Sequence, residues 1–468
     1  CYGKSQIVSP NFDKLASKSV LFTNCHAQQA VCAPSRVSLM TGMRPDYTQV
    51  LDLKTKMRDK NPNIITIPQH LKAEGYETIG IGKVLHGAKK NDPISWTRPF
   101  VTEDNLVYNK NHNKPADGQY QNETTRKTLT SIKNSSKKIK NTRKELAFRN
   151  ARPATECLDL PDNAYVDGAV AAKSIDILKQ LHKEETPFFM TLGFRKPHLP
   201  FVAPKKYWDL YTRKNLKIAA YQKPAKGAPT YALHTWGELK GYSDIPSEIN
   251  KEGLLNHSKQ RELIHGYYAS VSYIDAQLGK ILEYLESSKL EKNTLVILAG
   301  DHGWHLGDHG VWNKHSNYEQ ATRTPLFIML PGGKKGIKNS SPLELLDIFP
   351  TICDFLEIPL PKNLQGTSLI AIAKGKKEGV KNAALSQYPR YNKMGYALRT
   401  NRYRYIEWRE GNYKNSDSYK RGKLLSSELY DYEIDPLEKT NLTKSNSYVT
   451  LKNELKKQLD SIVGENRE

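Results

Sequence analysis

The sequence predicts an α/β protein with a large mixed, mostly parallel sheet flanked by helices, and a small C-terminal subdomain with an antiparallel sheet. Apolar runs typical of buried strands alternate with amphipathic helices through most of the chain, whereas short strands dominate its end. With 468 residues the chain is also too long for one average domain. We expect a catalytic domain over residues 1–370 and the smaller subdomain over residues 371–468.

The first expected elements place a cysteine at the start of a helix. A helix is expected to begin at Pro10, a strand to cover residues 20–22, and a second helix to cover residues 34–42, with proline near its start and glycine at its end. Cys32 therefore falls at a helix N-terminus.

The following elements repeat the order helix then strand. A capping box over residues 66–69 precedes a strand over 78–81, a helix over 166–181 precedes a strand over 188–192, and a helix over 262–285 precedes a strand over 295–298. Polar residues follow these strands: Lys83, His86, His198, Asp301 and His302. Because ligands bind beyond the carboxyl ends of strands in open α/β sheets, we expect these side chains to converge.

Two regions differ from this pattern. Residues 104–152 are rich in Asn, Lys, Ser and Thr, which indicates a surface insertion, either a solvated loop or a basic lip for an anionic polymer. After an expected helix over residues 343–356, strands are expected over 396–399, 403–408 and 429–431, and a closing helix over 449–459.

The charge of the chain indicates a polyanionic partner. Lys and Arg number 71 against 49 acidic residues, a formal charge of +22. The sequence has no zinc-finger spacing, RNP-like strand or basic heptad helix, so we expect no nucleic acid and favour a sulfated glycan. A surface that is basic only for solubility is the alternative.

Cysteine usage and hydropathy add little about the compartment. The five cysteines form no paired metal motif, and their odd number cannot all pair internally. No apolar run approaches the ~20 residues of a membrane-spanning helix, so we expect no membrane span. Because the sequence opens at Cys1 without a leader, we expect any signal peptide to have been removed or left out.

One short motif carries the most chemical information. Residues 32–36, Cys-Ala-Pro-Ser-Arg, are followed by Leu-Met-Thr-Gly at residues 39–42. Together they resemble the signature of the type I, formylglycine-dependent sulfatases, which belong to the alkaline phosphatase superfamily. Further segments resemble the iduronate-2-sulfatase-like group: residues 82–86, 195–201, 299–307, 387–390, 394–401 and 428–436. The resemblance implies an alkaline phosphatase-like fold and hydrolysis of a sulfate ester on a sugar.

The resemblance also implies how Cys32 acts. A formylglycine-generating maturation enzyme oxidises this cysteine to an aldehyde, whose hydrate attacks sulfur with one hydroxyl and later expels sulfate through the other. A plain thiol or serine ester has no neighbouring hydroxyl through which to collapse. The unpaired N–H groups of the helix N-terminus suit an anionic sulfate, and Arg36 would stabilise the diol.

Other roles follow from the same resemblance. Asp301 and His302, with the modified Cys32, would bind a divalent cation, usually Ca²⁺, for which carboxylate oxygen is a suitable ligand. Lys83, His86, His198 and Lys314 would form the basic pocket: Lys83 holds sulfate and diol, His86 takes the proton when the intermediate collapses, and His198 and Lys314 protonate the leaving sugar oxygen. Trp304, His305, Arg390 and Arg399 are candidates for sugar contacts or for roles in the core or surface.

Several alternatives stay open. The family's N-terminal pair of metal-binding aspartates is expected shortly before Cys1, outside the printed sequence, and their absence would favour a non-catalytic sulfoglycan-binding relative. A phosphodiesterase or phosphonate hydrolase with the same modified residue is a third possibility. Arg195 stands where the iduronate-2-sulfatase-like group commonly has histidine, which leaves the sugar open. A polymeric substrate favours a periplasmic or secreted location.

Overall fold

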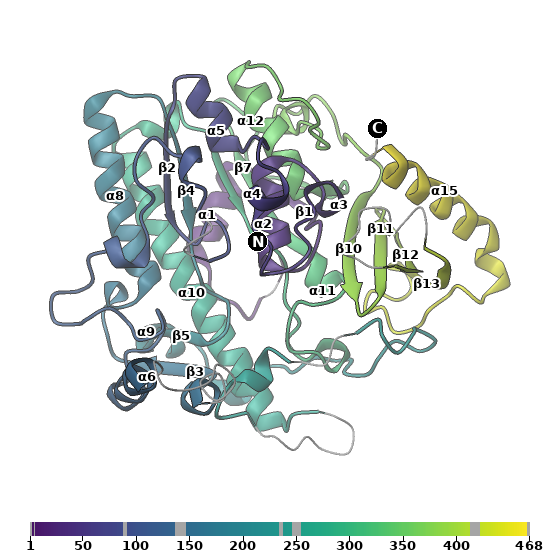
Figure 1. The fold of residues 1–468 in the computed structure, drawn as a ribbon, viewed down its shortest axis with the longest axis horizontal. Coiled ribbons are helices and arrows are strands. Elements are labelled where there is room, and N and C mark those ends of the chain that lie inside the picture. Colours follow the sequence, from purple (N-terminus) through teal and green to yellow (C-terminus); the bar gives the residue numbers. More distant parts are fainter. Residues whose placement is uncertain are drawn as a thin grey trace.

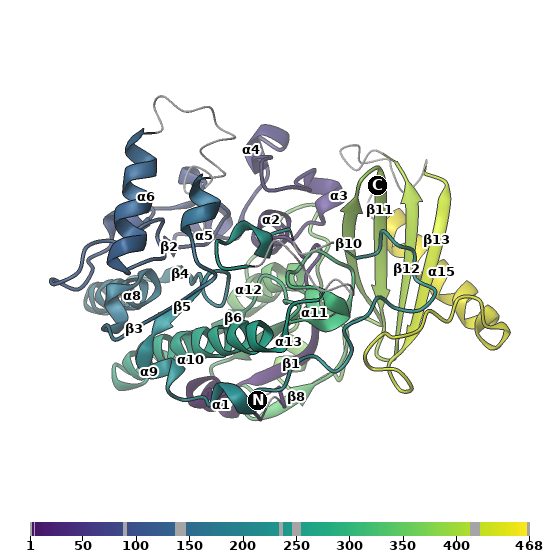
Figure 2. The ribbon, with the colours of Figure 1, turned by 90° about the horizontal axis from the view of Figure 1, so that it is seen from below.

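The computed structural model describes residues 2–3, 5–87, 91–135, 147–233, 237–245, 254–411 and 422–465. A large body of sheets and helices is followed by a smaller unit, made of a four-stranded sheet and the last helix, on its right-hand side in Figure 1. Figure 2 shows the long helix α10 (His257–Ser287) lying lengthwise in the large body, next to β5. No helix in the described part of the chain is long and apolar enough to cross a membrane.

The main sheet is mixed. Its strands lie in the order β6 (Val296–Ala299), β7 (Arg323–Met329), β1 (Val20–His26) and β8 (Ile337–Asn339), and β9 (Leu343–Glu344) also pairs with β1. β7 runs antiparallel to both β6 and β1, whereas β8 and β9 run parallel to β1. The predicted mixed sheet is therefore confirmed, with β7 as its antiparallel member.

Two shorter parallel pairs complete the large body. β2 (Glu77–Gly82) pairs with β4 (Phe188–Gly193), and β3 (Thr155–Leu158) pairs with β5 (Phe201–Pro204). Among the described strands, β4 pairs only with β2 and β6 only with β7. A cavity of about 1450 Å³ is lined by the side chains of both β4 and β6, and it reaches the residues that follow their carboxyl ends.

Helices cover the sheets, and α5 and α2 illustrate how capping residues set their ends. The remaining α-helices are α1 (Pro10–Lys18), α2 (Cys32–Thr41), α3 (Pro45–Thr48), α4 (Met57–Lys60), α5 (Ile67–Ala73), α6 (Glu123–Ser135), α8 (Val166–Glu184), α9 (Lys205–Trp208), α11 (Glu319–Thr322), α12 (Ile348–Leu356), α13 (Ile370–Ala373) and α15 (Val449–Glu465). The Thr66 hydroxyl accepts the amide of Gln69, as expected for the N-cap of α5. Gly42 ends α2 in the left-handed region, at φ 66°.

The smaller unit is a simple antiparallel sheet with a helix on one face. β10 (Ala384–Arg390), β11 (Lys393–Arg399), β12 (Tyr403–Glu410) and β13 (Leu424–Asp431) pair in chain order. Leu455, Leu459 and Val463 of α15 pack on one face of it, and the opposite face packs on Tyr318 and residues 225–233 of the large body. The expected antiparallel C-terminal sheet is thus confirmed.

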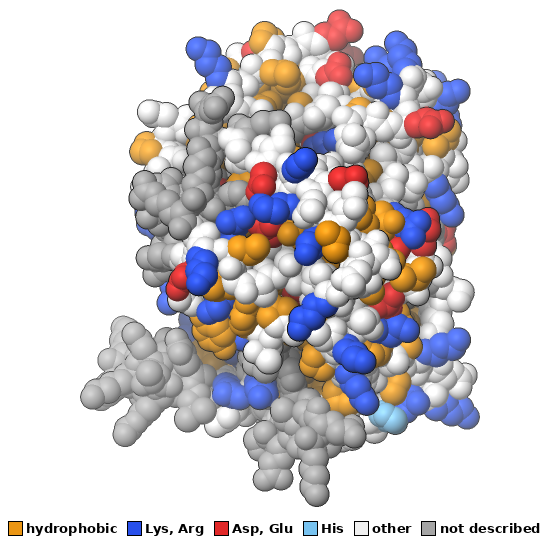
Figure 3. All heavy atoms as spheres, turned by 90° about the vertical axis from the view of Figure 1, so that its right-hand side faces the viewer, with side chains coloured by type: hydrophobic (Ala, Val, Ile, Leu, Met, Phe, Trp, Pro, Cys, Tyr) orange, Lys and Arg blue, Asp and Glu red, His pale blue; other side chains and the backbone are white. Residues whose placement is uncertain are grey.

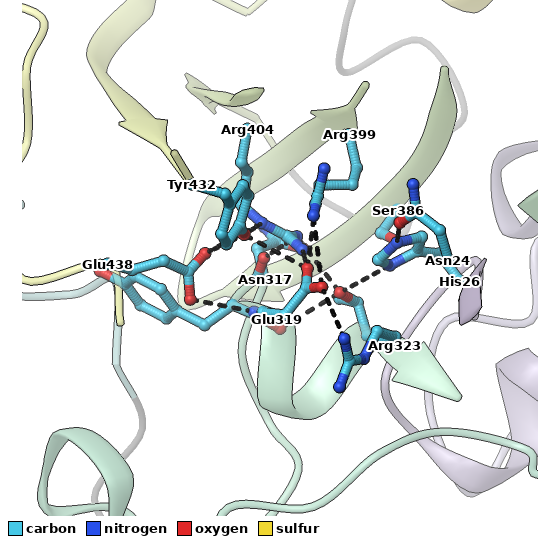
Figure 4. A network of polar contacts seen from close by, with 12 residues as sticks. Asn24, His26, Asn317, Glu319, Arg323, Ser386, Arg399, Arg404, Tyr432 and Glu438 are labelled. Carbon is cyan, nitrogen blue, oxygen red and sulfur yellow. Dashed lines mark hydrogen bonds and ion pairs between the residues drawn. The ribbon is translucent and has the colours of Figure 1, made fainter. Parts of the chain in front are cut away.

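A buried polar network joins this sheet to the large body (Figure 4). The Arg404 side chain on β12 is 0% exposed, and its guanidinium donates to Glu319 Oε2 at 2.5 Å and lies 3.0 Å from Glu438 Oε1. Arg399 Nε donates to the same Glu319 oxygen at 3.0 Å. Because Glu319 is the first residue of α11, the network fixes the start of that helix.

The structure differs from the sequence-based expectation in several places, and strands β3, β5 and β7 were not expected. Part of the segment over residues 104–152 is helix α6, which buries Leu129 in a cluster with Tyr120; residues 136–146 lie outside the described part. The helix expected from residue 343 begins only at Ile348, because residues 343–344 form strand β9. Strand β10 was not expected either. Pro389 lies near the end of this strand, and the backbone amide of Gln387 donates to the carbonyl oxygen of Gln28.

Candidate active site

Cys32 is the first residue of α2, as the sequence predicted for a helix N-terminus. Its preceding residue, Val31, is extended, and the Cys32 side chain is buried with 2% of the residue exposed. The Ser35 hydroxyl in the first turn donates to the carbonyl oxygen of Asp301, which follows β6. This bond holds the N-terminus of α2 against the carboxyl end of β6.

Arg36 links the same helix to two strand ends. Its Nε donates to Asp301 Oδ2 at 2.8 Å, and its Nη1 donates to the backbone carbonyls of Lys83 and Val84, after β2. The Lys83 amide in turn donates to Gly193 O at the end of β4, at 2.7 Å. As a result, the ammonium of Lys83 lies 3.9 Å from Cys32 Sγ.

His302 also lies beside the cysteine. Its Nε2 is 3.3 Å from Cys32 Sγ and 3.7 Å from Asp301 Oδ2. Its Nδ1 contacts Gly303 O at 2.8 Å, and a carbonyl only accepts, so Nδ1 carries the hydrogen and Nε2 faces the cysteine and the carboxylate. The imidazole is therefore oriented toward the centre of the cluster.

His198 and Lys314 form a second basic pair beside the cysteine. Lys314 Nζ lies 3.1 Å from His198 Nε2 and 5.0 Å from the centre of the Trp304 ring. The loop that carries His198 is held to α8, because the carboxylate of Asp167 on that helix accepts hydrogen bonds from the backbone amides of Arg195 and Lys196. Trp304 thus belongs to the site, 5.8 Å from the His198 ring.

Glu238, which the sequence analysis did not single out, contacts both members of this pair. Its Oε1 lies 3.0 Å from His198 Nε2 and its Oε2 lies 2.8 Å from Lys314 Nζ. It precedes a one-turn 3₁₀ helix, Leu239–Gly241, in an irregular segment. No strand end or hydrophobic periodicity marks this position, and so no sequence signal pointed to it.

The charges around Cys32 shift its ionisation strongly. Burial by itself raises the pKa of the thiol, but the ammonium groups of Lys314 and Lys83 and the imidazole of His302 lower it by more, so that the pKa falls well below its ordinary value. Burial lowers the pKa of Lys83. The site therefore stabilises negative charge at position 32, whatever group carries it.

Three of these side chains have the geometry of a metal site. The ligand atoms of Cys32, Asp301 and His302 all lie within 4.8 Å of one another. A carboxylate oxygen and an imidazole nitrogen facing one point fit a divalent cation, and oxidation of Cys32 to a hydrated aldehyde would replace sulfur with the oxygen that a hard cation prefers.

The remaining predicted residues are His86, His305, Arg390 and Arg399, none of which is among the described residues that line the cavity. His86 makes no hydrogen bond to the cluster within the described part of the chain, although its Nδ1 is buried. His305 is fully buried and bonds to Ser316 Oγ at 2.9 Å, and Arg399 is 7% exposed and paired with Glu319. Arg390 lies on β10, where its guanidinium stacks on Tyr391 at 4.4 Å. His305 and Arg399 therefore occupy core positions, which the sequence left open as an alternative to sugar contacts.

The cluster lies at one end of the cavity between β4 and β6. The residues that line this end include Arg36, Lys83, His198, Asp301 and His302, all from segments that follow a strand or begin a helix. The convergence expected from strand order is therefore present for Lys83, His198, Asp301 and His302, whereas His86 is not among these lining residues.

Comparisons with known proteins agree with this geometry. A family model described as sulfatase matches residues 1–358, and one described as N-sulphoglucosamine sulphohydrolase, C-terminal, matches residues 307–465. The chain is 31% identical over 513 residues to iduronate 2-sulfatase of Homo sapiens, covering 94% of this chain and 88% of the human protein. It is 30% identical over 453 residues to a sulfatase of Formosa agariphila, covering 93% of this chain and 78% of that protein.

Solved structures share the fold at lower identity. BT4656, solved in complex with its substrate D-glucosamine-2-N,6-O-disulfate, superposes with a TM-score of 0.73 at 21% identity and covers 100% of this chain and 95% of its own. A phosphonate monoester hydrolase of Agrobacterium radiobacter superposes with a TM-score of 0.72 at 20% identity, covering 99% and 92%. Both matches extend over nearly the whole of each chain.

Proposed function

Because the chain belongs to the sulfatase family, we propose that it removes sulfate from a sulfated oligosaccharide or polysaccharide at a site built on oxidised Cys32. Family membership implies formylglycine and a divalent cation in general. The observation that supports Cys32 as the modified residue is its position at the start of α2, with Lys83 and His302 within 3.9 Å and 3.3 Å of its sulfur.

Formylglycine at position 32 would supply, as its hydrate, one hydroxyl that attacks sulfur and a second through which sulfate is later released. Arg36 and Lys83 would hold the negative charge of the sulfate oxygens, together with the free N–H groups at the start of α2. Asp301, whose Oδ2 is held by Arg36 Nε at 2.8 Å, would accept a hydroxyl proton.

The leaving sugar oxygen needs a proton, because an alkoxide is a poor leaving group. His198 and Lys314, 3.1 Å apart, are the donors that the structure offers beside Cys32. His86 would take up the proton during release of sulfate, a role for which its unpaired Nδ1 leaves it available within the described part of the chain.

Asp301, His302 and an oxygen of the modified residue would hold the cation, which we propose to be Ca²⁺. When bound, it would supply positive charge against the sulfate oxygens. The carboxylate is the hard ligand of this set, and the imidazole is oriented toward the same point by its bond to Gly303 O.

The sugar class rests on the relatives and on charge. Iduronate 2-sulfatase and the complex with a sulfated glucosamine both concern sulfated sugars. The formal charge of +22 suits an anionic polymer, although Lys and Arg are scattered over the face of the molecule in Figure 3 rather than gathered in one patch. We further propose a periplasmic or secreted location and activation by a formylglycine-generating enzyme.

Co-expression with such a maturation enzyme tests the proposal. The peptide that contains Cys32 should carry an aldehyde by mass spectrometry, and the protein should release sulfate from sulfated oligosaccharides, measured by ion chromatography. Cys32→Ala should abolish release, whereas Cys157→Ser, at an exposed cysteine, should leave it unchanged. Binding of the glycan without release, or faster hydrolysis of phosphodiesters, would contradict the proposal.

A further inference from the structure

The carboxylate of Glu238 bridges the two basic groups on the leaving-group side of the site. One oxygen lies 3.0 Å from His198 Nε2 and the other lies 2.8 Å from Lys314 Nζ, while those two nitrogens are 3.1 Å apart. Two groups that can both carry positive charge repel each other at this distance. A carboxylate that contacts both compensates the repulsion and holds them together.

The side chains of Lys314, Glu238 and His198 are all largely shielded from water, and this shielding strengthens the electrostatic interaction between them. The side chain of Lys314 is 3% exposed and that of Glu238 is 22% exposed. Although burial raises it, the pKa of Glu238 is held well below its ordinary value by Lys314 and His198, so the carboxylate is charged. A charged Glu238 accepts from the ammonium of Lys314. It accepts from His198 Nε2 when the imidazole is doubly protonated, because Nδ1 already donates to Leu199 O at 2.6 Å.

The backbone of Glu238 is anchored independently of these contacts. The next residue, Leu239, is 1% exposed and packs in a hydrophobic cluster with Trp312, two residues before Lys314, and with Leu263 of α10. The carboxylate is therefore presented by a packed segment, as expected for a group that orients others.

We propose that Glu238 is a positioning residue for departure of the sugar oxygen, acting through His198 and Lys314. This rests on the proposed function. When the S–O bond to the sugar breaks, the electron pair stays on the sugar oxygen, which takes a proton from Lys314 Nζ or His198 Nε2. Glu238 keeps both donors in place until that transfer, and itself forms no bond to substrate.

The test compares two leaving groups in the enzyme matured with formylglycine. A sulfated disaccharide hydrolysed by the wild type needs a proton on its leaving oxygen, whereas 4-nitrophenyl sulfate releases a stable phenolate and does not. Glu238→Gln should lower kcat on the sugar sulfate by about 10²-fold, with a much smaller fall on the aryl sulfate and little change in KM. Glu238→Asp, which retains the charge, should recover part of the loss on the sugar sulfate.

The matched control is Glu262→Gln, which also removes a partly exposed carboxylate paired with a lysine, Lys259, but away from the site. It should leave both activities unchanged. Equal losses on the two substrates in Glu238→Gln and Glu238→Asp, or an unchanged kcat on the sugar sulfate, would overturn the inference while the proposed function stands. A wild type that releases sulfate from neither substrate would overturn both.

Discussion

Arg36 shows how one side chain assembles several parts of the site. Its guanidinium bonds Asp301 on one side and the carbonyls of Lys83 and Val84 on the other, and it is itself only one turn from Cys32. A planar group with several N–H donors in fixed directions can make these bonds at once. The position of Lys83 relative to Cys32 therefore depends on Arg36 as well as on β2.

Arg36→Lys should keep the positive charge but lose this geometry. Because an ammonium cannot reproduce the fork, we expect kcat/KM for sulfate release to fall by about 10²–10³-fold, or about 3–4 kcal/mol. The fraction of oxidised Cys32 is measured by mass spectrometry in parallel, so that lost maturation is distinguished from lost catalysis. Arg98→Lys serves as control, because this guanidinium bonds Glu184 and Glu77, and Glu77 begins β2 at the opposite end of the strand from Lys83. Full activity of the Arg36→Lys variant with Cys32 fully oxidised would contradict this role.

At the scale of elements, the close approach of β2 and β4 sets where Lys83 lies. A side chain at Gly193 would place its Cβ 2.0 Å from the Lys83 carbonyl carbon, a distance that no packing allows. The glycine lets the last residues of β4 lie directly against the residue that follows β2. The ammonium is thereby directed toward the start of α2.

Gly193→Ala should therefore move the end of β2 and displace Lys83. We expect a loss of about 1–3 kcal/mol in the free energy of unfolding and a fall of up to about 10²-fold in kcat/KM. Gly464→Ala is the control, because a Cβ there meets nothing within 4 Å and lies in helix α15, so stability should stay equal or rise slightly. Similar urea unfolding curves and activities for the two variants would show that neither stability nor the position of Lys83 depends on the close approach of β2 and β4.

The elements that carry the site were predictable from the sequence to different extents. The strands before Lys83, His198 and Asp301 have strong apolar patterns, and the order of alternating helices and strands places their carboxyl ends together. Glu238 was not predictable, because an irregular segment has no periodicity that locates it. The short motif around Arg399 was recognised, but a motif contains no information about burial, and the guanidinium bonds Glu319 instead of a ligand.

At the scale of the whole molecule, the C-terminal sheet supports the loop that carries Lys314. Arg404 on β12 donates to the carbonyl of Asn317 at 2.5 Å, and the Asn317 amide donates to Gly395 O on β11 at 3.1 Å. Glu319, at the start of α11, is bonded by Arg404 and Arg399 from the same sheet. The two units therefore share a buried polar junction (Figure 4), and Asn317 and Glu319 in it lie three and five residues after Lys314 in the sequence.

Removing the charge of Glu319 should weaken this junction in a way that depends on pH. Although burial raises it, the pKa of Glu319 is held well below its ordinary value by Arg399, His26 and Arg404. A carboxylate with a depressed pKa in the folded state contributes stability that is present above its unfolded pKa of about 4.3, and this stability is lost as the pH falls through the folded pKa. At neutral pH, Glu319→Gln should therefore lower the free energy of unfolding by about 3–5 kcal/mol, because it leaves the fully buried Arg404 without one of its carboxylate partners. The difference from the wild type, measured by urea unfolding, should shrink as the pH is lowered below that unfolded pKa.

The control is Glu433→Gln, which removes a surface carboxylate that is 64% exposed and paired with Arg402. This variant should change the free energy of unfolding by less than about 1 kcal/mol at any pH. If the Glu319→Gln difference were the same at neutral and acidic pH, the ion pairs of Glu319 would not be what joins the two units.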